Sequence, residues 1–368
     1  MTARPPLLLT PGPLTTSRAT REAMLVDWGS RDPAFIALTR GVRERIVRIA
    51  NGEGTHACIP VQGSGTYGIE AALGTFVPKG ARVLVLANGA YCYRIARILE
   101  TLGRVPVLYE TPEDTPPDPA EVGRRLDADP SLAHVAIVHC ETTSGILNPL
   151  EAVADVVAER GRSLFVDSMS AFGALPLDLA RIRADVVVAS SNKCLEGVPG
   201  LAFAVARRET IVRSAGNAPS VALDLHAQWA GFEKTGEWRF TPPTHVVAAL
   251  SAAIDQFDAE GGVEARGARY RENCRILVEG MRALGFRTYL PDALQAPIIV
   301  TFHTPEDPAF EFPRFYDFLG RRGFTIYPGK LTKIDSFRIG CIGQVAASDM
   351  RAAVAAVGEA MAELGARP

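Results

Sequence analysis

Short apolar runs alternate with amphipathic stretches over the first half of the chain. The runs are rich in β-branched residues and predict seven strands, which end at Val61, Ala87, Tyr109, Cys140, Val166, Ala189 and Ala206. Helical periodicity precedes the first strand over residues 33–50 and follows later strands over 94–102 and 148–160. Strands that alternate with helices predict an α/β fold with a mostly parallel sheet covered on both faces. We expect residues 201–206 to form an antiparallel edge strand.

The pattern changes after Arg207. Residues 216–245 are polar and aromatic with little regular periodicity, and a long irregular segment in a compact protein is usually functional. The remaining expected elements are helices over 244–260, 263–284, 313–322 and 348–364, and strands over 297–302, 324–327 and 336–341. We therefore expect an N-terminal arm over 1–20 that packs with the small domain, a large domain over 21–258 and a smaller α+β domain over 259–368.

Composition excludes several classes of function. The 368 residues carry a formal net charge of −2 with no long run of either sign, so neither nucleic acid nor an anionic membrane is an expected partner. The six cysteines have no metal-binding spacing, which favours core thiols in a reducing compartment and no metal site. The apolar run at 7–9 is too short for a signal peptide or a membrane span, so we expect a cytoplasmic protein.

An acid and a lysine follow two neighbouring predicted strands. Asp167 ends the run at 164–166, and Lys193 follows the run at 186–189 after a Ser-Ser-Asn turn. Pyridoxal phosphate (PLP) enzymes need this pair, because a lysine binds the cofactor aldehyde as a Schiff base and an acid pairs with the pyridinium nitrogen. Taken alone, the pair fits equally well a helix cap and a solvated lysine.

A glycine-containing loop follows the first predicted strand. The residues Gly63-Ser64-Gly65-Thr66 connect that strand to an alanine-rich helix. A strand, a glycine loop and a helix N-terminus together present backbone N–H groups to a phosphate. The alternative is that Ser64 or Thr66 only caps the helix.

Five candidate residues fall at the carboxyl ends of predicted strands, where ligands bind in such sheets. They are Ser64, Tyr91, Thr142, Asp167 and Lys193. Their convergence predicts one site, although Tyr91 taken alone is more typical of a packing residue.

Arg338 lies in an otherwise apolar predicted strand. It is a candidate for binding a substrate carboxylate or phosphonate through two hydrogen bonds, and the alternative is an edge-strand arginine that points to solvent.

Ten stretches of the sequence resemble one family over about residues 7–345. They read LLLTPGPLTTS, VQGSGTYGIEAALGT, ANGAY, HCETTSGILNPLEA, FVDSMSAFGALP, SSNKCLEGVPG, GEWRFTPPTHVVAAL, QAPIIVTF, YPGKLT and FRIGCIG. They are similar to the 2-aminoethylphosphonate–pyruvate aminotransferases, which belong to the class V, fold-type-I PLP aminotransferases. The resemblance implies a fold-type-I PLP transferase with a large domain and a smaller C-terminal domain.

The resemblance also implies which residues bind the cofactor. Lys193 would be the covalent lysine and the proton carrier, and Asp167 would pair with the pyridine nitrogen. Ser64, Gly65 and Thr66 would cradle the phosphate.

Further roles come from the same resemblance. Tyr91 would stack on the cofactor ring, Thr142 would bond its hydroxyl, and Asn192 stands where many relatives have glutamine. Thr241 would reach the cofactor phosphate of the partner subunit, which implies a homodimer with shared active sites. Arg338 would bind the carboxylate of pyruvate or alanine.

The implied reaction moves the amino group of 2-aminoethylphosphonate to pyruvate, giving phosphonoacetaldehyde and L-alanine in phosphonate degradation. Alanine–glyoxylate or serine–pyruvate exchange is the alternative within the aminotransferases. A desulfurase, a lyase or a binding module on the same fold is the alternative outside them, although Cys341 lies in a strand-like run and not in a mobile loop.

Overall fold

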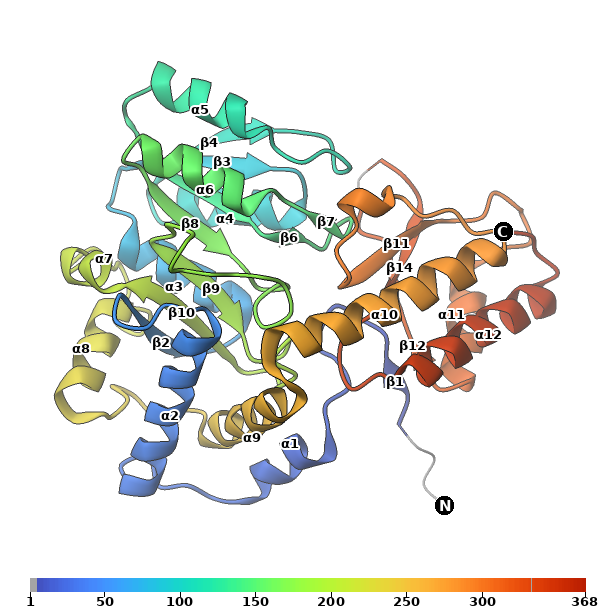
Figure 1. The fold of residues 1–368 in the computed structure, drawn as a ribbon, viewed down its shortest axis with the longest axis horizontal. Helices are drawn as coiled ribbons and strands as arrows, with labels where there is room; N and C mark the ends of the chain where they lie inside the picture. Colours follow the sequence, from blue (N-terminus) through green and yellow to red (C-terminus); the bar gives the residue numbers. More distant parts are fainter. Residues whose placement is uncertain (1–4, 332) are drawn as a thin grey trace.

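A computed structural model describes residues 5–331 and 333–368, and it places a large mixed sheet beside a smaller group of C-terminal elements (Figure 1). The large sheet contains β2 (His56–Gln62), β3 (Arg82–Ala87), β4 (Val105–Glu110), β5 (Leu132–Val138), β8 (Ser163–Asp167), β9 (Val186–Ser190) and β10 (Leu201–Arg207). Their order is β2-β10-β9-β8-β5-β3-β4, and only β10 runs against its neighbours.

The prediction that residues 201–206 form an edge strand was wrong. β10 is antiparallel as expected, but β2 pairs along its outer side from Gln62 to His56 and becomes the edge. These two strands are far apart in sequence, so no local pattern shows that they pair.

Both faces of the sheet are buried. Successive residues of β9 alternate between two hydrophobic clusters, with Val187 and Ala189 on one face and Val186 and Val188 on the other. The first face is covered by α2 (Pro33–Ile49), α5 (Pro119–Ala128), α6 (Leu150–Glu159) and α9 (Thr244–Glu260). The second is covered by α3 (Gly65–Phe76), α4 (Ala90–Thr101), α7 (Arg208–Arg213) and α8 (Leu225–Thr235). This burial explains the continuous apolar runs.

Two predicted segments differ from the structure for identifiable reasons. Helix α4 begins at Ala90 and not at residue 94, because the Glu141 carboxylate accepts the backbone N–H groups of Tyr91 and Cys92. The segment 216–245 is not wholly irregular, since α8 lies within it and Asp224 caps its first turn.

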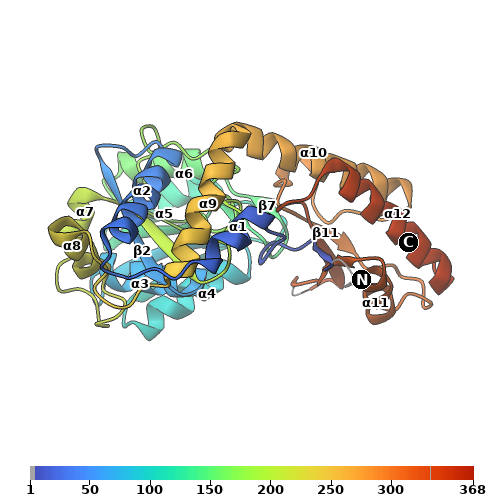
Figure 2. The same cartoon turned by 90° about the horizontal axis from the view of Figure 1, so that it is seen from below.

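The C-terminal elements form a second hydrophobic cluster. They comprise α10 (Gly262–Ala283), β11 (Ile299–His303), α11 (Phe312–Arg321), β12 (Phe324–Thr325), β13 (Tyr327–Pro328), β14 (Ser336–Gly340) and α12 (Ala347–Leu364). A three-stranded sheet has the order β11-β14-β13, and α10 lies beside α12 (Figure 2). The single strand expected over 324–327 is split, because β12 pairs with β1 (Leu7–Leu8) and β13 pairs with β14.

Short elements complete the described chain. They are α1 (Arg18–Glu22), a 3₁₀ turn at Ala23–Leu25, the two-stranded ribbon of β6 (Cys140–Glu141) and β7 (Ile146–Leu147), and a 3₁₀ turn at Asp292–Leu294. The strand expected over 134–140 therefore leaves the large sheet after Val138.

All six cysteines are buried and form no disulfide, which confirms the interpretation that they are core thiols. No helix within the described residues is both long and apolar enough to cross a membrane.

Candidate active site

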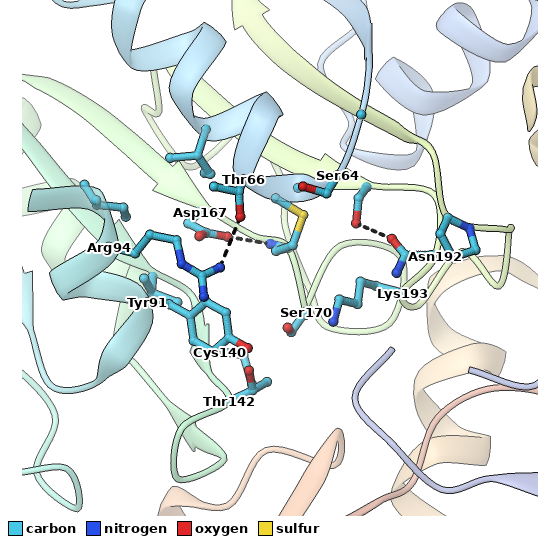
Figure 3. A pocket seen from close by; sticks show the side chains of 18 of the residues that line it. Ser64, Thr66, Tyr91, Arg94, Cys140, Thr142, Asp167, Ser170, Asn192 and Lys193 are labelled. Atoms are coloured by element: carbon cyan, nitrogen blue, oxygen red, sulfur yellow. Dashed lines mark hydrogen bonds between the residues drawn. The ribbon is translucent and has the colours of Figure 1, made fainter. Parts of the chain in front are cut away.

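A cavity of about 480 Å³ opens at the carboxyl ends of the parallel strands (Figure 3). Eight of the ten candidate residues line it, namely Ser64, Gly65, Thr66, Tyr91, Thr142, Asp167, Asn192 and Lys193. The sequence argument from strand ends therefore brought together residues that the structure places around one space. Thr241 and Arg338 are not among the residues that line it.

The N-terminus of α3 forms one wall of the cavity. Ser64 occupies the N-cap position, but its side chain makes no capping hydrogen bond, so the hydroxyl is free for another acceptor or donor. Thr66 Oγ1 accepts a hydrogen bond of 3.1 Å from Arg94 Nη1. The first turn of an α-helix has backbone N–H groups without intrahelical partners. This wall therefore has the donors that a phosphate requires, with the Arg94 cation beside them.

Asp167 forms the floor of the cavity at the end of β8. Its carboxylate is buried and accepts a hydrogen bond of 2.9 Å from the N–H of Met169. Burial raises the pKa of Asp167 to about 6, because desolvation disfavours the ionised form. A cationic group placed against this carboxylate would offset that cost. The protonated nitrogen of a pyridine ring is such a group.

Lys193 reaches the cavity from the turn after β9. Its amine donates hydrogen bonds to the carbonyl oxygens of Pro11 (2.5 Å) and Gly12 (3.3 Å) in the N-terminal arm. Gly12 has φ = 105°, and a Cβ there would lie 2.6 Å from Lys193 Cδ, so the arm approaches closely only through glycine. Burial lowers the pKa of the Lys193 amine and favours the neutral, nucleophilic form.

Tyr91 lies in the first turn of α4, where Glu141 holds its backbone. Its ring lines the cavity, with the Arg94 guanidinium carbon 4.8 Å and Lys330 Nζ 3.9 Å from the ring centroid. Burial raises the pKa of Tyr91, but the positive charges of Lys193 and Lys330 and the hydrogen bonds to Thr142 and Lys330 together outweigh burial, so the net pKa is lowered. Tyr91 is thus a cavity residue, surrounded by cations, as well as a packing residue.

Arg338 lies behind Thr142 in the middle strand of the small sheet, and not on an edge. Its Nη1 donates to the carbonyl of Thr142 (2.8 Å) and its Nε to that of Pro328 (3.1 Å). The residue is 6% exposed, so the alternative of a solvent-facing arginine was wrong. No carboxylate among the described residues forms an ion pair with it. A buried guanidinium with no carboxylate in ion-pair contact is well suited to an anionic ligand.

Thr241 lies elsewhere on the same chain. It is exposed and borders a second cavity of about 430 Å³ together with Tyr67 and Phe240. Gly63 lines both cavities, so the second opens beside the loop that follows β2. Within one chain, Thr241 does not join the other candidates.

Sequence reasoning missed three charged residues around the cavity. Arg94 lies three residues after Tyr91, on the same face of α4, and an earlier helix start would have indicated it. Glu141 was assigned only to a polar turn, although its carboxylate also accepts hydrogen bonds from the N–H and hydroxyl of Thr143. Lys330 follows β13 and meets Tyr91 only through the tertiary fold, so no local signal reveals it.

These residues fit pyridoxal phosphate group by group. The wall of α3 suits its phosphate, the carboxylate of Asp167 suits its ring nitrogen, and the amine of Lys193 suits its aldehyde. In the described part of the chain, no group of three His, Cys, Asp or Glu residues is placed to hold a metal ion.

Comparisons with known proteins agree with this chemistry. The family described as aminotransferase class-V matches residues 28–329. A 2-aminoethylphosphonate–pyruvate transaminase of Burkholderia lata is 55% identical over 99% of this chain and 97% of its own length. One of Pseudomonas aeruginosa is 55% identical over 98% of this chain and 97% of its own length.

Solved structures share the fold. An alanine–glyoxylate aminotransferase of Nostoc sp. superposes with a TM-score of 0.91 at 23% identity, covering 98% of this chain and 96% of that chain. A pyridoxamine–pyruvate aminotransferase of Mesorhizobium loti gives a TM-score of 0.89 at 25% identity, over 99% and 94%. The fold is therefore that of the fold-type-I aminotransferases, and membership of this class implies PLP as the cofactor. The chain belongs to the class-V aminotransferases and, within that class, to the family of the 2-aminoethylphosphonate–pyruvate transaminases.

Proposed function

We propose that this protein transfers the amino group of 2-aminoethylphosphonate to pyruvate and so forms phosphonoacetaldehyde and L-alanine. The observation that carries the proposal is the near full-length similarity to enzymes named for that reaction. The site supports it, because the buried acid and the lysine line one cavity and Arg338 donates to the carbonyl of Thr142, which lines the same cavity.

Each residue contributes a defined step. Bound PLP supplies an electron sink for the substrate carbon that loses its proton. Asp167 would pair with the ring nitrogen and keep it protonated. Lys193 would hold the aldehyde of the cofactor, and its amine, when free, would move the substrate proton as general base and acid. The lowered pKa of Lys193 makes its neutral form available for this step.

The substrates differ in charge, and the pocket must bind both. Arg338 would hold the carboxylate of pyruvate or alanine through a two-pronged contact. The phosphonate carries up to two negative charges and needs a second cation. Lys330 and Arg94 lie over the Tyr91 ring and form no ion pair with a carboxylate among the described residues. We therefore propose that these two cations bind the anionic groups of the substrate and the cofactor.

The first test of the function is an absorption spectrum of the PLP-loaded protein. The lysine-bound cofactor absorbs at about 410–430 nm and the aminated cofactor at about 330 nm. We expect 2-aminoethylphosphonate to convert the first band into the second, and pyruvate to restore it. Conversion by alanine or serine but not by the phosphonate would favour exchange with glyoxylate or pyruvate instead. A protein that forms no visible band with PLP would contradict the enzyme assignment.

We further propose a cytoplasmic homodimer in which Thr241 reaches the partner's cofactor phosphate. Three large apolar side chains are exposed, namely Tyr67 (56%), Val221 (73%) and Phe240 (52%). Such exposure to water is unfavourable and is unusual in a monomer. Two of them border the same cavity as Thr241. A second copy would cover them and would bring Thr241 to the phosphate wall beside Gly63.

Mixed dimers test this arrangement. Lys193→Ala should be inactive, and Thr241→Ala should bind PLP about 10-fold more weakly, the effect of losing one hydrogen bond to a charged group. Refolding the two variants together should restore a site with full PLP affinity, because the intact Lys193 and the intact Thr241 then meet in one site. If Thr241 acts within its own chain, the mixture will have only the weak affinity of Thr241→Ala.

A further inference from the structure

Glu196 is a buried carboxylate in the turn that carries Lys193. Its side chain is 3% exposed, and its backbone has φ = 58°, a left-handed conformation that residues with a side chain rarely adopt. Its N–H donates a 2.8 Å hydrogen bond to the carbonyl of Lys193. One tight turn therefore fixes the positions of Lys193 and Glu196 relative to each other. A strained residue is retained where its surroundings hold it strongly.

Helix α10 supplies the first set of partners for this turn. Oε1 of Glu196 accepts hydrogen bonds from Arg269 Nη2 (2.8 Å) and from the Tyr270 hydroxyl (2.6 Å). Arg266, whose side chain is 1% exposed, donates to the carbonyl of Cys194 (2.6 Å). The turn is thus attached to the helix at both its backbone and its carboxylate.

The chain after β14 supplies the second set. Oε2 of Glu196 accepts a 2.6 Å hydrogen bond from Gln344 Nε2, and Arg269 Nη1 donates 2.6 Å to the carbonyl of Gly343. Gln344 lies just beyond Gly340, where the strand that carries Arg338 ends. One carboxylate therefore connects the turn that carries the lysine to the segment that carries the substrate arginine.

Charge is balanced within this group. Glu196 and Glu260 face Arg266 and Arg269, and Glu260 accepts from their Nε atoms at 2.6 and 2.7 Å. Among the described residues, Glu260 forms hydrogen bonds and ion pairs with Arg266 and Arg269 but none with the Lys193 turn or with residues 343–344. It therefore carries the same charge as Glu196 but does not connect the two segments. The chain thus contains its own matched control.

We infer that Glu196 is a positioning residue that fixes the position of Lys193 relative to Arg338. The inference rests on the proposed function, in which Arg338 binds the substrate anion while Lys193 moves the proton at the reacting carbon. A misplacement of about 1 Å between two such groups can lower a rate by about 100-fold. Neither residue touches the other, so a third group must set the distance between them.

The experiment compares Glu196→Ala with Glu260→Ala, each loaded with PLP and measured per loaded site. Glu196→Ala should raise KM for both substrates and slow both half-reactions by about 10- to 100-fold. Glu260→Ala should lower the melting temperature similarly but change these constants less than about 3-fold. Both variants should still load with PLP, because the α3 wall and the Asp167 carboxylate lie outside the hydrogen bonds of Glu196 and Glu260.

A rescue variant separates positioning from folding. Glu196→Gln keeps an acceptor for Arg269 and Tyr270, and the Gln344 amide can turn to accept from the new amide, so most of the rate should return. If Glu196→Ala does not fold, Gln344→Ala is used, since Gln344 is exposed and its loss removes only the connection to the segment after β14. It should raise KM without lowering the melting temperature.

Two results would overturn the inference. One is equal kinetic losses in Glu196→Ala and Glu260→Ala, which would indicate a general loss of stability. The other is unchanged constants in Glu196→Ala or, where that variant does not fold, in Gln344→Ala. Failure of the proposed function differs from both, because the wild type itself would not react with 2-aminoethylphosphonate. The comparison is then made with alanine, whose carboxylate Arg338 would hold in the same way.

Discussion

Replacing Lys193 with alanine is expected to lower turnover by about 10⁴-fold or more, the range for loss of a combined nucleophile and general base. The amine is the only group that the proposal uses for both tasks, and its Nζ lies at the cavity that Asp167 also lines. The loss is measured as the rate of each half-reaction with added PLP.

Two comparisons make this result specific. Lys79→Ala removes an exposed lysine near the opposite ends of the strands, before β3, and should leave both rates unchanged. A small amine such as ethylamine, added to Lys193→Ala, should restore part of the proton transfer. Retention of more than about 1% of the wild-type rate without added amine would show that another base acts at this carbon.

Asp167→Asn is expected to lower turnover by about 10²- to 10⁴-fold in the PLP-loaded protein, while making the cofactor-free protein more stable at pH 8. Asparagine keeps an oxygen for the Met169 N–H but cannot hold the ring nitrogen protonated. In the cofactor-free protein, asparagine replaces a carboxylate that is ionised at a cost. Melting temperatures with and without PLP and the half-reaction rates measure both effects. Asp155→Asn, at an exposed position of α6, is the control.

The pKa of Asp167 determines how the stability of the cofactor-free protein should change with pH. Burial raises the pKa of Asp167 from 3.8 to about 6, so the folded state disfavours the ionised form. The ionised Asp167 carboxylate therefore destabilises the folded state fully above pH 6, and this destabilisation disappears as the pH falls from 6 to below 4. The destabilisation amounts to about 3 kcal/mol for the difference between a pKa of 3.8 and one of about 6. The advantage of Asp167→Asn in the cofactor-free protein should therefore shrink between pH 8 and pH 5. An advantage that stays constant over this range would contradict the assignment to Asp167.

Local patterns predicted most of the site because its geometry follows from strand ends. Asp167 and Lys193 come directly after buried runs, and parallel strands place such residues at one edge. The same argument placed Ser64 and Thr142 correctly around the cavity. The catalytic and binding roles of these residues remain predictions, which the variants above test.

The features that the sequence did not reveal depend on partners distant along the chain. Helix α4 starts four residues early because Glu141 accepts its first N–H groups. The place of β10 inside the sheet depends on β2, and Lys330 meets Tyr91 only after the C-terminal elements fold against the large sheet. Periodicity and turn signals describe neighbours in sequence, so they contain no information on these pairs.

The N-terminal arm has a consequence for the order of assembly during synthesis. Leu7 and Leu8 pair with Phe324 and Thr325, so this strand of the arm is synthesised long before its partner strand. The arm also supplies the carbonyl groups that accept hydrogen bonds from the amine of Lys193. The surroundings of the lysine are therefore completed only after nearly the whole chain has been released. A nascent chain could therefore form its large sheet before the surroundings of Lys193 are complete.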